Sequence, residues 1–81
     1  MSLLGAIRDD MTALGCSPWF TDDVLRTLEH TSRYQQLTFR YRANGYTEAE
    51  IAQALHKGQA SISRYVHTLR HCLHSLAQSI S

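Results

Sequence analysis

The fold is decided by residues 47–66, which read TEAEIAQALHKGQASISRYV. Thr47 and Glu50 form a capping box, in which the threonine hydroxyl accepts from the Glu50 amide while the Glu50 side chain reaches back. Tyr46 and Ile51 stand where a hydrophobic staple belongs. These signals predict a short helix that ends at about Leu55, a tight turn at residues 56–58, and a second helix from about residue 59.

The same stretch carries the residues that two steeply crossing helices need. A small residue, Ala52, stands where the helices would approach, and the turn contains Gly58. Apolar side chains at three- and four-residue steps supply the packing between the helices: Ile51, Leu55, Ile62 and Val66.

Helical spacing continues through the rest of the chain. Apolar residues predict a first helix that ends at Gly15, a second that starts at Ser17-Pro18 or at Thr21, and a third over about 32–43 that ends at Asn44-Gly45. The third helix is apolar on two sides, with Tyr41 on one and Phe39 on the other, so we expect it in the middle. The last helix continues to about residue 79. We therefore predict one all-α domain over residues 1–81, a small bundle of four to five helices.

Bulk properties limit the class of protein. The chain has 81 residues and two cysteines, Cys16 and Cys72, which we interpret as small apolar core groups and not as a disulfide framework. No stretch has the features of a signal peptide or the roughly 20 apolar residues of a membrane span. We expect a soluble, cytoplasmic protein without a membrane partner.

Charge is distributed unevenly along the chain. Up to His30 there are two basic and five acidic residues, a net charge of −3, and from Thr31 onward there are six basic and two acidic residues, a net charge of +4. Glu50 is the last acidic residue in the sequence. A basic half of this kind favours binding to a phosphate backbone, although an uneven surface alone could produce it.

Two phrases carry a resemblance to a known class of proteins: GYTEAEIAQAL at residues 45–55 and ASISRY at residues 60–65. They resemble the helix-turn-helix of bacterial regulators of the tetrahelical kind, as in region four of sigma factors, GerE/LuxR response regulators and TrfB-like plasmid repressors. The resemblance covers roughly residues 34–76. One difference is that such motifs usually have glycine directly after the first helix, where this chain has His56 and Lys57.

The resemblance implies a helix-turn-helix at about residues 47–70 that binds double-stranded DNA, supported by the helices of residues 2–43. A recognition helix presents its first residues to base edges, so the expected base contacts are Gln59, Ala60, Ser63, Arg64 and His67. Arg64 would bind guanine and Gln59 adenine. The expected phosphate contacts are Arg40, Arg42, Thr47, Lys57, Ser61 and Thr68.

The last helix also has a heptad-like spacing, at positions 62, 66, 69, 73, 76 and 80. Its later members need a cover, which is either the N-terminal helix through Ile7 and Met11 or a partner subunit. We favour a homodimer, with Leu69, Leu73, Leu76 and Ile80 as its interface and the N-terminal helices as a further possible contact.

Together these inferences predict a transcriptional repressor that binds a palindromic operator at the nucleoid. The alternative is an adaptor that resembles a sigma-factor domain and binds RNA polymerase or another regulator, suggested by Phe39 and the acidic N-terminal half. His67, His71 and His74 also allow a metal hypothesis, but no cysteine or carboxylate completes the ligand set, so we expect no metal. We expect no catalysis, cofactor or small-molecule ligand.

Overall fold

Five α-helices follow one another along the chain, joined by short turns. The computed structural model describes the backbone of residues 2–80 and the side chains of residues 2–71 and of His74. The helices are α1 (Leu3–Ala13), α2 (Pro18–Leu28), α3 (Arg33–Ala43), α4 (Glu48–Leu55) and α5 (Gln59–Ile80). The described residues contain no strand, which confirms the prediction of a small all-helical bundle.

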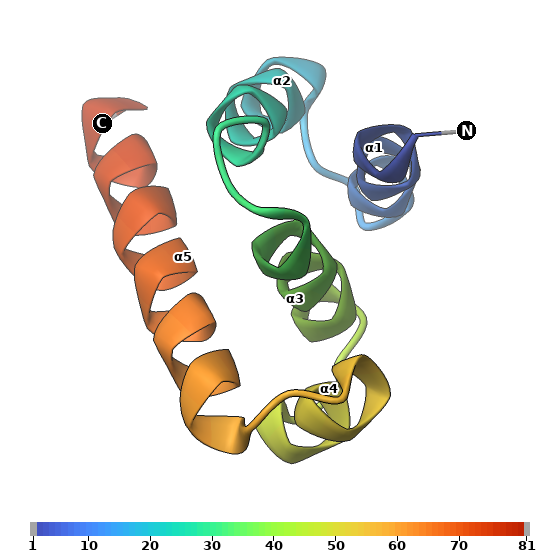
Figure 1. Cartoon of the computed structure of the whole chain (residues 1–81). Coiled ribbons are helices and arrows are strands. Elements are labelled where there is room, and N and C mark those ends of the chain that lie inside the picture. Colours follow the sequence, from blue (N-terminus) through green and yellow to red (C-terminus); the bar gives the residue numbers. More distant parts are fainter. Residues whose placement is uncertain (1, 81) are drawn as a thin grey trace.

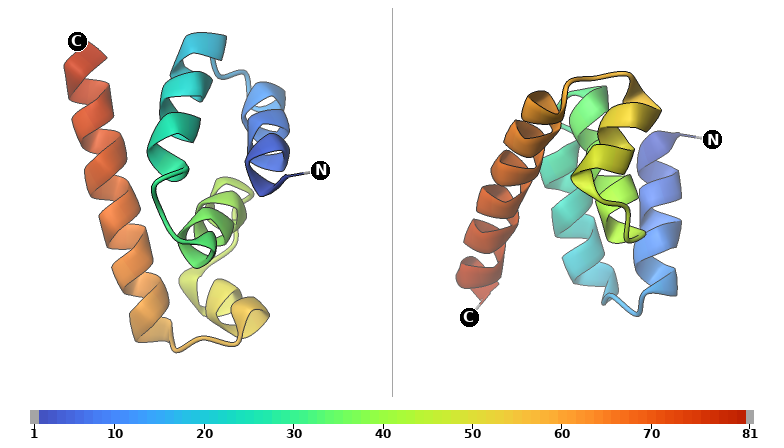
Figure 2. Two further views of the ribbon diagram at one scale, coloured as in Figure 1. Left: turned by 45° about the horizontal axis from the view of Figure 1, so that its top comes forward. Right: turned by 90° about the horizontal axis from the view of Figure 1, so that it is seen from below.

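The helix α3 lies in the middle of the bundle (Figure 1). It contacts α1, α4 and α5, while α2 packs between α1 and α5. In both further views, α5 runs along the side of the molecule opposite to α1 (Figure 2). The start of α1 and the end of α5 therefore lie on opposite sides of the molecule.

The core consists of two apolar clusters that α5 connects. The first contains buried residues of α1, α2 and α5: Ile7, Met11, Val24, Leu25, Leu28 and Leu69. The second contains buried residues of α4 and α5: Ile51, Ala52, Ile62 and Val66. On α3, Phe39 packs against the first cluster and Tyr41 against the second, in agreement with the predicted central position of this helix.

Local signals explain where α2 and α3 begin. Of the two predicted starts for α2, the structure has the one at Ser17-Pro18, and the buried Thr21 hydroxyl donates to the Ser17 carbonyl at 2.9 Å. At α3, Ser32 and Gln35 form a second capping box, which the sequence analysis had missed.

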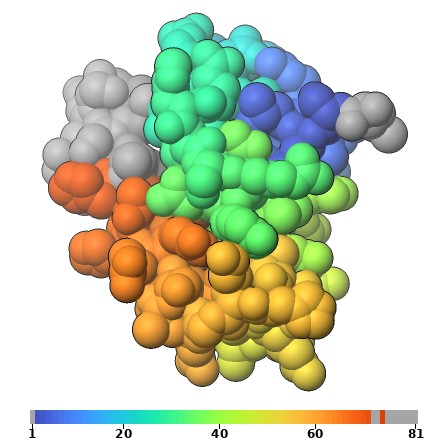
Figure 3. Space-filling model, viewed as in Figure 1, coloured from blue at the N-terminus to red at the C-terminus, as the bar shows by residue number. Residues whose placement is uncertain are grey.

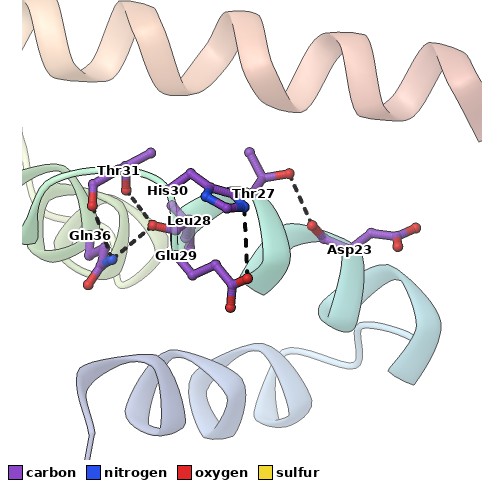
Figure 4. Close-up of polar contacts among 7 residues, drawn as sticks. All are labelled: Asp23, Thr27, Leu28, Glu29, His30, Thr31 and Gln36. Carbon is purple, nitrogen blue, oxygen red and sulfur yellow. Dashed lines mark hydrogen bonds and ion pairs between the residues drawn. The ribbon is translucent and has the colours of Figure 1, made fainter.

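Side-chain hydrogen bonds fix the connection between α2 and α3 (Figure 4). The Leu28 carbonyl accepts from the Thr31 hydroxyl at 2.6 Å and from the Gln36 amide at 2.8 Å. The same amide also donates to the Thr31 carbonyl at 3.4 Å. The last carbonyl of α2 thus has one partner in the turn and one in α3, and this sets where α3 starts relative to the first cluster.

Three helices end in the same hydrogen-bond pattern, the Schellman motif. At α1, the Gly15 amide donates to the Thr12 carbonyl and the next amide reaches back five residues. At α3, the Gly45 amide does the same toward Arg42. Both glycines have a positive φ, +85° and +89°, which a side chain would strain.

The third Schellman motif ends α4 and has no glycine at its left-handed position. His56 takes that position, with φ 54° and ψ 43°. Its amide donates to the Gln53 carbonyl, and the Lys57 amide donates to the Ala52 carbonyl. Gly58, which the sequence analysis made the turn glycine, does not have a positive φ and instead precedes α5, where its carbonyl accepts from Ser61 and Ile62.

The capping box predicted at the start of α4 is present. The Thr47 hydroxyl accepts from the Glu50 amide at 3.2 Å, and the Glu50 carboxylate accepts from the Thr47 amide at 2.9 Å. The hydrogen bond from the Thr47 amide, and to a smaller extent the one from the Thr47 side chain, lowers the pKa of Glu50 below its usual value. The ionised carboxylate therefore stabilises the folded state.

Within the described residues, none of the five helices combines the length and the apolar character that crossing a membrane requires.

We expect His56→Gly to stabilise the protein by about 0.5–1 kcal/mol, because it relieves a side chain from a left-handed backbone at some cost in chain entropy. Chemical denaturation measures the change. The control is Ala54→Gly, two residues earlier inside α4, which should lower stability by about 1 kcal/mol. A loss of stability with His56→Gly would show that the histidine contributes more than its backbone costs.

Glu50→Gln should reduce the loss of stability in acid. The pKa of Glu50 is lower in the folded than in the unfolded state, so its contribution is complete above the unfolded value and is lost as the pH falls through the folded one. A glutamine keeps the capping hydrogen bond without titrating, as Gln35 does at α3. Thermal unfolding from about pH 6 to about pH 3 should therefore show a smaller decrease in Tm for the variant than for the wild type. Glu29→Gln, which removes an exposed carboxylate just after α2, is the matched control for the change in charge.

Candidate nucleic-acid interface

One side of α5 presents all the side chains predicted to contact bases. The residues Gln59, Ala60, Ser63, Arg64 and His67, here called the α5 face, are all exposed. They are exposed because Ile62 and Val66, on the opposite side of the same turns, are buried in the second cluster. In Figure 3 the first half of α5 (orange) and α4 (yellow) form one continuous surface in the lower part of the molecule.

The predicted phosphate contact Arg40 already has an acidic partner within the chain. Its guanidinium donates to the Asp10 carboxylate at 2.9 Å, and the Asn44 amide donates to the same carboxylate oxygen at 3.2 Å. This network lies in an open cleft of about 510 Å³ lined by residues of α1, α3 and α4 and of the turn between α3 and α4. Arg40 thus neutralises an acid of α1, and its contact with phosphate stays a prediction.

The other predicted phosphate contacts have mixed surroundings. The Lys57 ammonium lies 4.3 Å from the centre of the Tyr34 ring, a cation–π contact that holds it beside the turn. The exposed Arg42 donates to the Tyr46 carbonyl at 2.8 Å. On α5, Thr68 is exposed and Ser61 half-buried. Thr47 is exposed, but Glu48 and Glu50 follow it, so an anion at that helix start would meet two carboxylates.

Arg70 is a candidate that the sequence analysis missed. It is exposed and lies with Arg42 at a groove of about 240 Å³ between α3 and α5, which is lined by Phe39, Ala43, Val66 and Leu69. Arg70 follows Ser63 by seven residues, or about two helical turns, so the two lie on the same side of α5. That spacing could have revealed it.

The distribution of ion pairs separates the two halves of the molecule. The described arginine–carboxylate pairs are Arg8–Asp22, Arg26–Asp23 and Arg40–Asp10, and all use acids of α1 and α2. Among the described residues, Arg64 and Arg70 take part in no ion pair. The sequence of α5 contains no acidic residue. The positive charge of this helix is therefore available to an anionic partner.

A carboxylate of α4 approaches the α5 face. The Ser63 hydroxyl donates to a Glu48 carboxylate oxygen at 2.5 Å, joining the first residue of α4 to the second turn of α5. Ser63 was predicted to contact a base, and no pattern in the sequence indicated Glu48 as its partner.

Of the four residues predicted at the dimer interface, the structure describes the side chain of Leu69 alone. Leu69 is buried in the first cluster with residues of α1 and α2, so the same chain covers it there. Leu73, Leu76 and Ile80 lie outside the described side chains.

The structure bears on the predictions for the two cysteines and for a metal site only where side chains are described. Cys16 is half-buried against the first cluster, as its interpretation as a core group requires, and Cys72 lies outside the described side chains. Where side chains are described, no three His, Cys, Asp or Glu residues are grouped so that they could hold a metal ion.

No protein-family model, curated protein or solved structure matches this chain.

Proposed function

We propose that this chain is a sequence-specific DNA-binding regulator of transcription, in which α4 and α5 act as a helix-turn-helix and α5 enters the major groove. One observation carries the proposal. The five residues of the α5 face are exposed together on a helix without acidic residues, while Ile51 and Ile62, both fully buried, hold that helix against α4. A rigid helix with short polar and basic side chains over its first two turns fits the major groove.

Each group then has a defined part in binding. Arg64 donates to guanine O6 and N7, and Gln59 pairs with adenine, both near the start of α5. Arg70 and Arg42 at the groove, with Lys57, Ser61 and Thr68, contact the phosphate backbone and set the position of the protein without reading sequence. His67 lies on the α5 face one turn beyond Ser63, where it reaches the next base or phosphate.

A homodimer on a palindromic operator at the nucleoid completes the proposal. One recognition helix contacts few bases, and a two-fold axis doubles the contacts. Since Leu69 belongs to the chain's own core, the dimer would use the sequence positions after it: Leu73, Leu76 and Ile80. Repression is the simplest mode of action, because covering a promoter requires binding alone.

A protein-binding adaptor is the second candidate, and one observation favours it. Trp19 and Leu14, on either side of the turn between α1 and α2, are 54% and 63% exposed. Large exposed apolar side chains often mark protein contacts. The features that first suggested an adaptor now count less, since Asp10, Asp22 and Asp23 are in ion pairs and Phe39 packs against the core. Co-purification of a polymerase subunit with a chain that ignores DNA would favour this candidate.

Arg64→Ala should relax base preference at one position of the bound site by about 1–3 kcal/mol, because a bidentate contact to guanine is lost. Selection from a random duplex pool, followed by fluorescence anisotropy on the enriched duplex and its single-base variants, measures the preference. Arg26→Ala, an exposed arginine on α2, is the control and should keep the wild-type preference. Equal affinity of the wild type for all duplexes at moderate salt would refute the proposed function.

Arg70→Ala should weaken binding to all duplexes alike and leave base preference unchanged. A phosphate contact contributes affinity through counterion release, so the slope of log K against log salt should decrease by about 1. Binding isotherms at several salt concentrations provide the slope. A selective loss on one base variant would instead place Arg70 at a base.

A further inference from the structure

The hydrogen bond between Ser63 and Glu48 determines what this part of the α5 face can bind. Its length, 2.5 Å, is that of a charge-assisted bond from a hydroxyl to a carboxylate. Glu48 is half-buried at the start of α4, and Ser63 is exposed. The bond therefore brings a carboxylate to the edge of a surface whose other charged members are basic.

The fold does not require this bond. Glu48 in the first turn of α4 already interacts favourably with the helix dipole, and an exposed serine hydroxyl can be hydrated. A carboxylate next to an anion-binding surface also lowers its affinity for phosphate. An arrangement that the fold does not need and that opposes backbone binding is better explained by selectivity.

The hydrogen-bonding capacity that Ser63 and Glu48 have left determines which base they can bind. A serine hydroxyl has one proton, which Ser63 here donates in its hydrogen bond to Glu48, so the Ser63 oxygen can only accept from a third group. The carboxylate likewise only accepts. Phosphate oxygens, guanine O6 and N7 and thymine O4 are acceptors too, and they cannot pair with either oxygen.

Two bases present an amino group in the major groove. Adenine N6 stands beside the acceptor N7, which would face the second oxygen of the pair, while cytosine presents only its N4 amino group. Cytosine therefore fits two neighbouring acceptors better than adenine does.

We propose that Glu48 and Ser63 act as a pair of acceptors that selects cytosine at one position of the DNA site. This inference deepens the proposed function and depends on it. Glu48 thereby becomes a specificity-determining residue contributed by α4, next to the bases that Arg64 and Gln59 contact from α5.

The test compares base preferences among wild type, Glu48→Gln and Ser63→Ala, using selection from a random duplex pool and binding to single-base variants. The wild type should enrich cytosine at one position and lose about fivefold to tenfold in affinity when thymine, with O4 in place of N4, replaces it. Both variants should lose that preference and keep the one that depends on Arg64. The salt slope of Ser63→Ala should equal the wild-type slope, because that variant changes no charge and removes no phosphate contact.

Asp9→Asn is the matched control, since it removes an exposed negative charge from α1, away from α5, and should leave the cytosine preference unchanged. Circular dichroism checks that each variant is folded, and Ser63→Ala, an exposed substitution, carries the test if Glu48→Gln disturbs α4. An unchanged cytosine preference in folded variants overturns the acceptor pair while the proposed function stands. Enrichment of adenine in place of cytosine overturns the assignment of the base. A wild type that enriches no sequence overturns both.

Discussion

The burial of Ile51 and Ile62 in one cluster is the constraint on which the candidate interface depends. Both side chains are fully buried, and they fix α4 and α5 to each other on either side of a turn of three residues. Because successive residues of a helix are rotated by about 100°, burial of one side of α5 in the core exposes the opposite side to solvent. The exposure of Arg64 and Ser63 therefore follows from the packing of their neighbours.

Local chemistry made most of the fold predictable. The capping box at Thr47, the glycines after α1 and α3, and the spacing of apolar residues indicated all five helices, because these signals act over a few residues of the chain. The position of the turn after α4 was predicted correctly, but the residue that adopts its left-handed conformation was not. The expected glycine, Gly58, has no positive φ, and His56 adopts the left-handed conformation instead. A backbone strain of this kind is tolerated when the hydrogen bonds on both sides fix it, and no local pattern announces it.

The surroundings of the candidate residues were less predictable than their exposure. Asp10 and Arg40 are 30 positions apart in the sequence, and Ser63 and Glu48 are 15 apart. Such pairs form only when helices cross, so periodicity within one helix cannot reveal them. The heptad-like spacing of α5 has the same limit, since it identified Leu69 as apolar but could not say whether its cover comes from the same chain.

Because α5 packs into both apolar clusters, a movement of the helix at one cluster is transmitted to the other. Leu69 anchors it among α1 and α2, and Ile62 anchors it against α4. Arg64 lies between the two anchors, about 7.5 Å along the axis from Leu69 at 1.5 Å per residue. A helix is stiff over that distance, so a tilt of α5 at its contact with α1 and α2 displaces the Arg64 guanidinium as well. The N-terminal helices thus help to set the position of Arg64 through the packing of Leu69.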